Sequence, residues 1–216
     1  EEVFQWVEQK VYRVMAGALA NDFPILEFIG GRKKKDSLYT KLLSKPDVSA
    51  SQIYDKVRFR IVTRSSADIF PVLNYVQRSL VPFNFVIPGQ STNTLLRFHD
   101  YCQSEPELAR LVPDLQLPLD IEDGLSAIDN RFTAPSYRVV HFIADVPVRV
   151  PDNVLAQAPE ATADLGHTIF VQTEFQVIDR ETDESNEAGD ASHRAYKARQ
   201  KLAVMHRLKV GRYIKS

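Results

Sequence analysis

The sequence has little that would suit a protein outside the cytoplasm: one cysteine, no long apolar run and no signal-peptide pattern at its start. Because Cys102 stands alone, no disulfide can form within the chain, which fits a reducing compartment. No apolar run approaches the roughly 20 residues that span a bilayer. With 44% hydrophobic and 25% charged residues, the composition is ordinary for a globular fold. We therefore expect a cytoplasmic protein that does not associate with membranes.

The formal net charge of -1 conceals three segments of one-sided charge. Between Gly31 and Arg64, ten Lys/Arg stand against three Asp, and between Asp100 and Asn130 eight acids stand against Arg110 alone. After His193 the chain has eight Lys/Arg and no acids. Charge runs are most often solvated faces. Two basic runs beside polar motifs nevertheless favour an anionic partner such as a nucleotide phosphate.

Hydrophobic periodicity predicts a single α+β domain over residues 1–216, with helices around one mixed sheet. The predicted helices cover 2–20, a basic segment ending at Ser44, 67–80 and 191–209. The predicted strands cover 56–63, 83–87, 137–150 and 168–179. We interpret residues 1–30 as an N-terminal helical part with a chain break at Gly30-Gly31. Residues 99–134 are interpreted as an insertion at the edge of the domain, with a short helix at 108–117. We expect a loop or short helix over 151–166 and an acidic mobile segment over 181–190.

Polar side chains alternate with apolar ones on three of the predicted strands. On 168–179, Glu174 and Gln176 share the face opposite Phe175 and Val177, because successive strand residues point to opposite sides. The strand at 137–150 places Tyr137 and His141 on one face, and the strand at 56–63 places Arg58 and Arg60 opposite its apolar residues. Each row alone fits a solvated face as well as a cleft, but three such rows favour a cleft.

Two predicted helices carry polar stripes beside these strands. His193, Tyr196, Lys197 and Gln200 are spaced to share one side of the C-terminal helix, a pattern that is usually a surface stripe. Ser37 and Lys41 are four residues apart, and Lys33 precedes them. A helix N-terminus preceded by lysines offers amide donors and positive charge, which suits a triphosphate.

Five segments in chain order resemble the synthetase domain of the RelA/SpoT family, which makes the alarmone guanosine tetraphosphate. The matching residues are Lys33, Ser37, Leu38 and Lys41; Asp55, Phe59, Arg60 and Ile61; Tyr137 and His141; Glu174, Phe175, Gln176 and Val177; and His193, Tyr196 and Lys197. The departures are equally specific: Arg58 replaces a glycine, Pro135-Ser136 replaces Asn-Gly, and Ile178-Asp179 replaces Arg-Thr. The family's first arginine aligns with Gly31, so Arg32 is displaced by one residue.

The resemblance implies a nucleotidyltransferase-like mixed sheet and a role for each matched residue. Asp55 would hold Mg²⁺, and Glu174 would be a second metal contact or the general base for the acceptor hydroxyl. The ATP phosphates would be held by Arg32, Lys33, Ser37, Lys41 and Arg60. The acceptor would be bound by Tyr137, which stacks on its base, and by His141, Gln176, His193 and Lys197.

The implied reaction moves the β,γ-pyrophosphate of ATP onto the 3′-oxygen of GDP or GTP and leaves AMP. Its partners would be ATP and a guanine nucleotide, and a second copy of the chain is a further candidate. The departures leave two alternatives open: an acceptor that is an adenine nucleotide or an RNA end, and a nucleotide-binding module without turnover. A hydrolase is disfavoured, because the sequence has no His-Asp metal cluster of the kind that alarmone hydrolases use.

Overall fold

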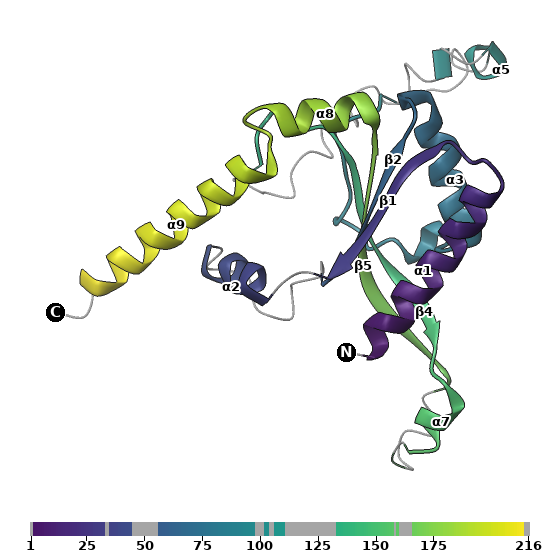
Figure 1. The fold of residues 1–216 in the computed structure, drawn as a ribbon, viewed down its shortest axis with the longest axis horizontal. Helices are drawn as coiled ribbons and strands as arrows, with labels where there is room; N and C mark the ends of the chain where they lie inside the picture. The colour runs from purple at the N-terminus through teal and green to yellow at the C-terminus, as the bar shows by residue number, and fades with distance from the viewer. Residues whose placement is uncertain are drawn as a thin grey trace.

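A mixed five-stranded sheet forms the centre of the protein in a computed structural model (Figure 1). The structure describes residues 2–32, 35–44, 56–97, 102–103, 106–110, 133–157, 159 and 166–213. The strands are β1 (Ile25–Arg32), β2 (Val57–Thr63), β3 (Thr92–Asn93), β4 (Val140–Arg149) and β5 (Thr168–Asp179). Their order is β1-β2-β5-β4-β3, in which β2 and β5 are parallel and the other neighbours antiparallel. The predicted α+β class is confirmed.

Helices flank the sheet on both sides and extend beyond it (Figure 1). The described α-helices are α1 (Glu2–Ala20), α2 (Lys35–Ser44), α3 (Ile69–Ser79), α5 (Pro106–Ala109), α7 (Asp152–Leu155), α8 (Arg180–Ala188) and α9 (His193–Tyr213). Two 3₁₀ turns, η2 (Ser66–Asp68) and η3 (Phe83–Phe85), complete the described helical segments. Within the described ranges, no helix is both long enough and apolar enough to span a membrane.

The hydrophobic core lies between α1, α3 and one side of the sheet, which we call the core face. Alternate residues of the strands point into it, among them Phe59, Ile61 and Phe175, each at most 1% exposed. The Phe59 ring stacks on Phe28 and on Phe175, with centroids 5.4 and 5.7 Å apart. Burial of such aromatic area is a main source of stability in a domain of this size.

Gly30 allows the close approach of α1 to this aromatic cluster. A Cβ at Gly30 would lie 2.5 Å from the Tyr12 hydroxyl and 2.6 Å from the Phe59 ring. The expected chain break at Gly30-Gly31 is therefore wrong, because both glycines lie inside β1. The N-terminal part over 1–30 accordingly contains most of a strand as well as a helix.

Three other local predictions differ from the structure. Residues 83–87 form η3 and an isolated bridge from Val86 to Ala144 instead of a strand, since Pro82 precedes them and a turn at Gly89 follows. The acidic segment predicted to be mobile is helix α8. Tyr137 precedes β4, which begins at Val140. Of the helix predicted over 108–117, residues 111–117 lie outside the described part, as does most of 99–134.

Candidate functional site

The side of the sheet opposite the core carries polar residues from three adjacent strands. Pairing places Arg58 beside Glu174, and Arg60 beside Gln176, across the parallel β2–β5 ladder. His141 of β4 pairs with Gln176 from the other side. Paired strand residues point to the same face, so these five residues form one surface, which we call the polar face. The alternation predicted for these strands is confirmed.

Glu174 lies in the middle of the polar face and is 6% exposed. Its Oε1 accepts a hydrogen bond of 2.7 Å from Gln176 Nε2, and His141 Nε2 lies 3.3 Å from the same oxygen. A buried carboxylate needs such partners, because an isolated one is costly to remove from water. The arrangement fixes the carboxylate in one orientation, as a base or a metal ligand requires.

Tyr137 comes to the polar face from the segment before β4. Burial raises the pKa of its phenol; Arg60 and Arg58 oppose this increase, whereas Glu174 and Glu187 add to it. Tyr137 is half-buried, its phenol remains protonated at neutral pH, and it lies within the electrostatic field of charged residues on the two central strands. An aromatic ring in this position offers a stacking surface for a base.

His193, the first residue of α9, also faces this charge cluster. Desolvation lowers the pKa of the imidazole, and Lys197, Arg58 and Arg60 lower it further, while Glu187 opposes them. The lowered pKa favours the uncharged imidazole at neutral pH, and Lys197, Arg58 and Arg60 are near enough to contribute to this decrease. Such a concentration of positive charge favours a polyanionic ligand.

Helix α9 continues from the polar face and packs against α2. Lys197 Nζ donates to Ser37 Oγ at 3.2 Å, and Arg207 Nη1 donates to the Leu43 carbonyl at 2.8 Å. The structure thereby joins two predicted site residues that are 160 positions apart. Lys41 lies on the same helix α2. Lys33 and Asp55, the remaining predicted residues of the donor site, lie outside the described part of the chain.

Arg32 does not join this cluster. In β1 it pairs with Val57, so it lies on the core face, where its guanidinium makes hydrogen bonds of 2.8 and 2.9 Å to the Glu8 carboxylate of α1. The family's arginine aligns with Gly31, and a displacement of one residue in a strand moves a side chain to the opposite face. The structure therefore places Arg32 away from the polar face, and its role in binding ATP phosphates stays a prediction.

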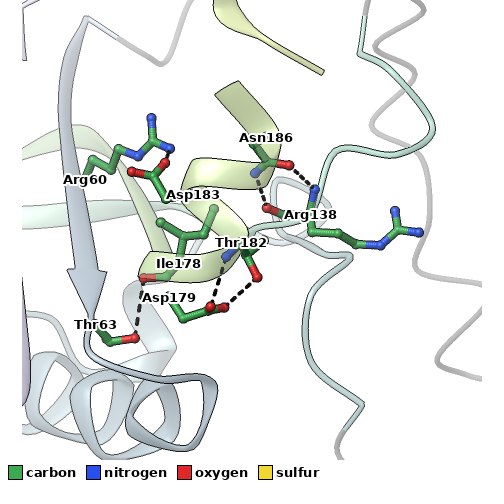
Figure 2. Close-up of polar contacts among 8 residues, drawn as sticks. All are labelled: Arg60, Thr63, Arg138, Ile178, Asp179, Thr182, Asp183 and Asn186. Atoms are coloured by element: carbon green, nitrogen blue, oxygen red, sulfur yellow. Dashed lines mark hydrogen bonds and ion pairs between the residues drawn. The ribbon is translucent and has the colours of Figure 1, made fainter. Parts of the chain in front are cut away.

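Helix α8 adds residues that the sequence reasoning missed. Figure 2 shows Arg60 and Asp183 pointing toward one another, and the two side chains form a half-buried ion pair. The helix begins at Asp179, whose carboxylate accepts hydrogen bonds from the Thr182 amide at 3.0 Å and the Thr182 hydroxyl at 2.7 Å. A cap at Asp179 followed by acids in the first turn was a readable helix signal.

The described residues offer a partial ligand set for Mg²⁺. Glu174 supplies the hard carboxylate oxygen that this ion prefers, and Asp55 lies outside the described part. Among the described residues, no group of three or more His, Cys, Asp and Glu is placed to hold a metal ion. Mg²⁺ commonly binds through one or two carboxylates together with substrate phosphates. The donor chemistry therefore fits a metal that arrives with a triphosphate.

The fold is an α+β layer built on a mixed sheet, and similar solved structures exist. The chain is similar to small alarmone synthetase 1 from Bacillus subtilis, with 14% identity, 98% of this chain and 88% of that chain covered, and a TM-score of 0.47. It is similar to small alarmone synthetase 2 from the same organism, with 16% identity, 98% and 90% covered, and a TM-score of 0.48. A GTP pyrophosphokinase family protein from Streptococcus pneumoniae gives 11% identity, 99% and 86% covered, and a TM-score of 0.47. No family model and no curated protein matches the sequence.

Proposed function

We propose that the chain transfers pyrophosphate from ATP to the 3′-hydroxyl of a guanine nucleotide, which is alarmone synthesis. One observation carries the proposal: register and helix packing gather Arg60, Glu174, Tyr137 and Lys197 around a single face of the sheet. These residues come from four of the five segments that resemble the RelA/SpoT synthetases. A buried acid, a shielded ring and several cations match the parts that a nucleotide phosphotransfer needs.

In this proposal Arg60 and Ser37 of the described part would contact the triphosphate of the donor, and Lys33 and Lys41 would extend the set. Lys197, which donates a hydrogen bond to Ser37, would support the acceptor or its phosphates. Arginine suits phosphate oxygens because its planar fork donates two parallel hydrogen bonds. Bound Mg²⁺, held by Asp55, would neutralise charge on the β- and γ-phosphates, and Glu174 would be either a second metal contact or the general base.

The acceptor would lie on the side of Tyr137. Its base would stack on that ring, and its 3′-hydroxyl would approach Glu174, with His141 and Gln176 beside the carboxylate. The hydroxyl oxygen forms a bond to the β-phosphorus, the bond from that phosphorus to the oxygen shared with the α-phosphate breaks, and AMP leaves. The hydroxyl proton passes to Glu174. Catalysis is then chiefly positioning and charge stabilisation, with general base help of about 10²- to 10⁴-fold.

A second candidate acceptor is an RNA end. Helix α9 starts at the polar face with His193 and Lys197 and extends away from the sheet (Figure 1), and Arg194, Lys201 and Arg207 are exposed along it. A phosphate backbone could follow such a helix. Binding would then weaken steeply with salt, because each phosphate contact releases counterions.

The test is a separation of products by anion exchange after incubation with ATP, Mg²⁺ and, in separate reactions, GDP, GTP, ADP and bulk tRNA. We expect a more highly phosphorylated guanine nucleotide with equal release of AMP, and no product from Glu174→Gln. Label on tRNA would identify the RNA acceptor instead. Binding of ATP without product in any reaction would contradict the proposal and indicate a nucleotide-binding module.

A further inference from the structure

The segment that presents Tyr137 is held mainly by residues from elsewhere in the fold. Residues 137–139 precede β4, so the strand ladder does not fix them. Their six backbone polar groups are nevertheless all hydrogen-bonded. The Tyr137 amide donates to the Ala134 carbonyl at 3.0 Å, and the other five groups are bonded by two residues, Thr94 and Asn186.

Asn186 of α8 bonds both groups of the Arg138 peptide. Its Oδ1 accepts from the Arg138 amide at 3.1 Å, and its Nδ2 donates to the Arg138 carbonyl at 2.8 Å (Figure 2). Asn186 is 3% exposed, whereas most of α8 faces solvent. Asparagine is an unfavourable residue inside a helix, so a buried one with both amide groups satisfied indicates a specific role.

Thr94 holds the same segment from the side of β3. Its hydroxyl accepts from the Val139 amide at 3.0 Å and lies 3.1 Å from the Tyr137 carbonyl, to which it can donate. The Thr94 amide donates to the Val139 carbonyl at 3.0 Å. Two elements far apart in sequence thus clamp three consecutive residues, one from each side.

Helix α8 is itself anchored at the site. Asp179 caps its first turn, and Asp183 pairs with Arg60 of the polar face. Asn186 lies seven residues after the cap and three after Asp183, so the helix connects the Arg60 side chain to the backbone of Arg138, the residue after Tyr137 (Figure 2). Residues three or four apart share one side of a helix, which explains how one helix serves both contacts.

We propose that Asn186 and Thr94 are positioning residues, which hold the backbone of residues 137–139 so that the Tyr137 ring keeps its place on the polar face for the acceptor base. The inference rests on the proposed function for the identity of the ligand, although the clamp itself does not. The clamped residues follow the Pro135-Ser136 turn, which stands where the RelA/SpoT pattern has Asn-Gly.

The expected kinetic effect is selective for the acceptor. A misplaced ring loses stacking with the base and leaves the donor contact of Arg60 in place. We expect Asn186→Asp, which keeps the shape and removes the donor to the Arg138 carbonyl, to raise the KM for GDP about tenfold and the KM for ATP less than about twofold. Thr94→Val should act in the same direction, and Thr94→Ser, which keeps the hydroxyl, should restore the acceptor KM.

The experiment combines these kinetics with a measurement that needs no turnover. The protein is labelled with 3-fluorotyrosine, and the ¹⁹F resonance of Tyr137 is identified by its absence in Tyr137→Phe. We expect this resonance to shift in Asn186→Asp and Thr94→Val, and to keep its position in Thr94→Ser. Asn74→Asp, the same chemical change at an exposed position of α3, is the matched control and should leave both the resonance and the KM values unchanged.

Each outcome decides the inference. A shifted Tyr137 resonance with a selective rise in the acceptor KM supports it. An unchanged resonance in both Asn186→Asp and Thr94→Val overturns it, and so do KM values for GDP and ATP that rise together. If the wild-type protein turns over no nucleotide, the proposed function fails, and the ¹⁹F resonances still decide whether the clamp positions the ring.

Discussion

The two faces of the central sheet differ in almost every property, although their side chains alternate along the same strands. On β2, Phe59 is 1% exposed and packed among aromatic rings, while its neighbours Arg58 and Arg60 point to the polar face. The core face is closed by α1 and α3. The polar face is bordered by α8 and the start of α9 and holds charged groups (Figure 1). Apolar packing and charged groups are thus divided between the two sides of one sheet.

The displacement of Arg32 shows how strictly this division depends on strand parity. Gly31 pairs with Arg58 and lies on the polar side, whereas Arg32 pairs with Val57 and lies on the core side, bound to Glu8. A glycine thus stands on the polar side of β1, and the neighbouring Arg32 forms an ion pair between β1 and α1. Charge at the site must come from other residues, and Arg58 is placed to supply it.

The largest predicted effect is a loss of stability from a substitution on the core face. Phe59→Ala removes a ring that stacks on two others, and we expect it to lower the free energy of unfolding by about 3–5 kcal/mol. Urea denaturation followed by circular dichroism measures this change. The matched control is Phe83→Ala, where the ring is 72% exposed and the loss should be within about 0.5 kcal/mol. Equal losses at the two positions would contradict the assignment of the core.

The second-largest effect is expected from removing the Tyr137 ring, which we propose to stack on the base of the acceptor. Tyr137→Ala should raise the KM for the acceptor about 5- to 150-fold, since stacking on a base contributes roughly 1–3 kcal/mol, and should leave the KM for ATP nearly unchanged. Initial rates at varied concentrations of each substrate measure both constants. Tyr137→Phe keeps the ring and should behave almost as wild type. A comparable rise in the KM for both substrates in Tyr137→Ala would contradict the proposal that Tyr137 binds the acceptor specifically.

A smaller effect should follow from releasing Arg60. Asp183 neutralises its guanidinium, so ATP must compete with that carboxylate for the same cation. We expect Asp183→Asn to tighten ATP binding about 3- to 10-fold, measured by calorimetry in a buffer of fixed ionic strength. Asp190→Asn removes the same charge from an exposed position just after α8 and is the control. An equal increase in ATP affinity in the two variants would indicate a general effect of the lost negative charge and exclude direct competition at Arg60.

The smallest predicted effect is the titration of His193. Burial and the neighbouring Lys197 and Arg58 lower its pKa, so its NMR midpoint should lie below 6.5. Because the unfolded chain binds this proton more readily, the group should reduce stability as the pH falls from 6.5 through the folded value. Lys197→Met should raise the midpoint, while Lys201→Met, at an exposed position of the same helix, should not. A His193 midpoint that does not change in Lys197→Met would show that Lys197 does not lower the pKa of His193.

Much of the division between the two faces could be predicted from the sequence, because alternation on β2 and β5 is regular. Both strands were predicted nearly to their ends, and so was α1, whose apolar stripe includes the buried Val7 and Val11. Helix α8 was missed, because its acidic surface has no apolar stripe. Its stability comes from the Asp179 cap and from contacts of Asp183 and Asn186 with distant residues.

The residues of the site could be predicted only in part, because some of them come together through contacts between distant segments. Glu174, Gln176 and His141 followed from parity within strands, which is a local property. The Lys197–Ser37 contact joins α9 to α2, and the Asn186–Arg138 contact joins α8 to the segment before β4. Such contacts depend on tertiary packing, which no local pattern encodes. The position of Arg32 on the core face follows from the register of β1, which the residue type alone does not show.

The most direct test of the central claim, that the polar face transfers pyrophosphate from ATP, is a reaction with position-labelled ATP. Parallel reactions would contain ATP labelled with ³²P at the α-, β- or γ-phosphate, together with Mg²⁺ and GDP or GTP. Our account predicts that the β and γ labels move together to the acceptor while the α label remains in AMP, and that Glu174→Gln transfers none. Transfer of the γ label alone, or release of the labels as free phosphate or pyrophosphate, would contradict it.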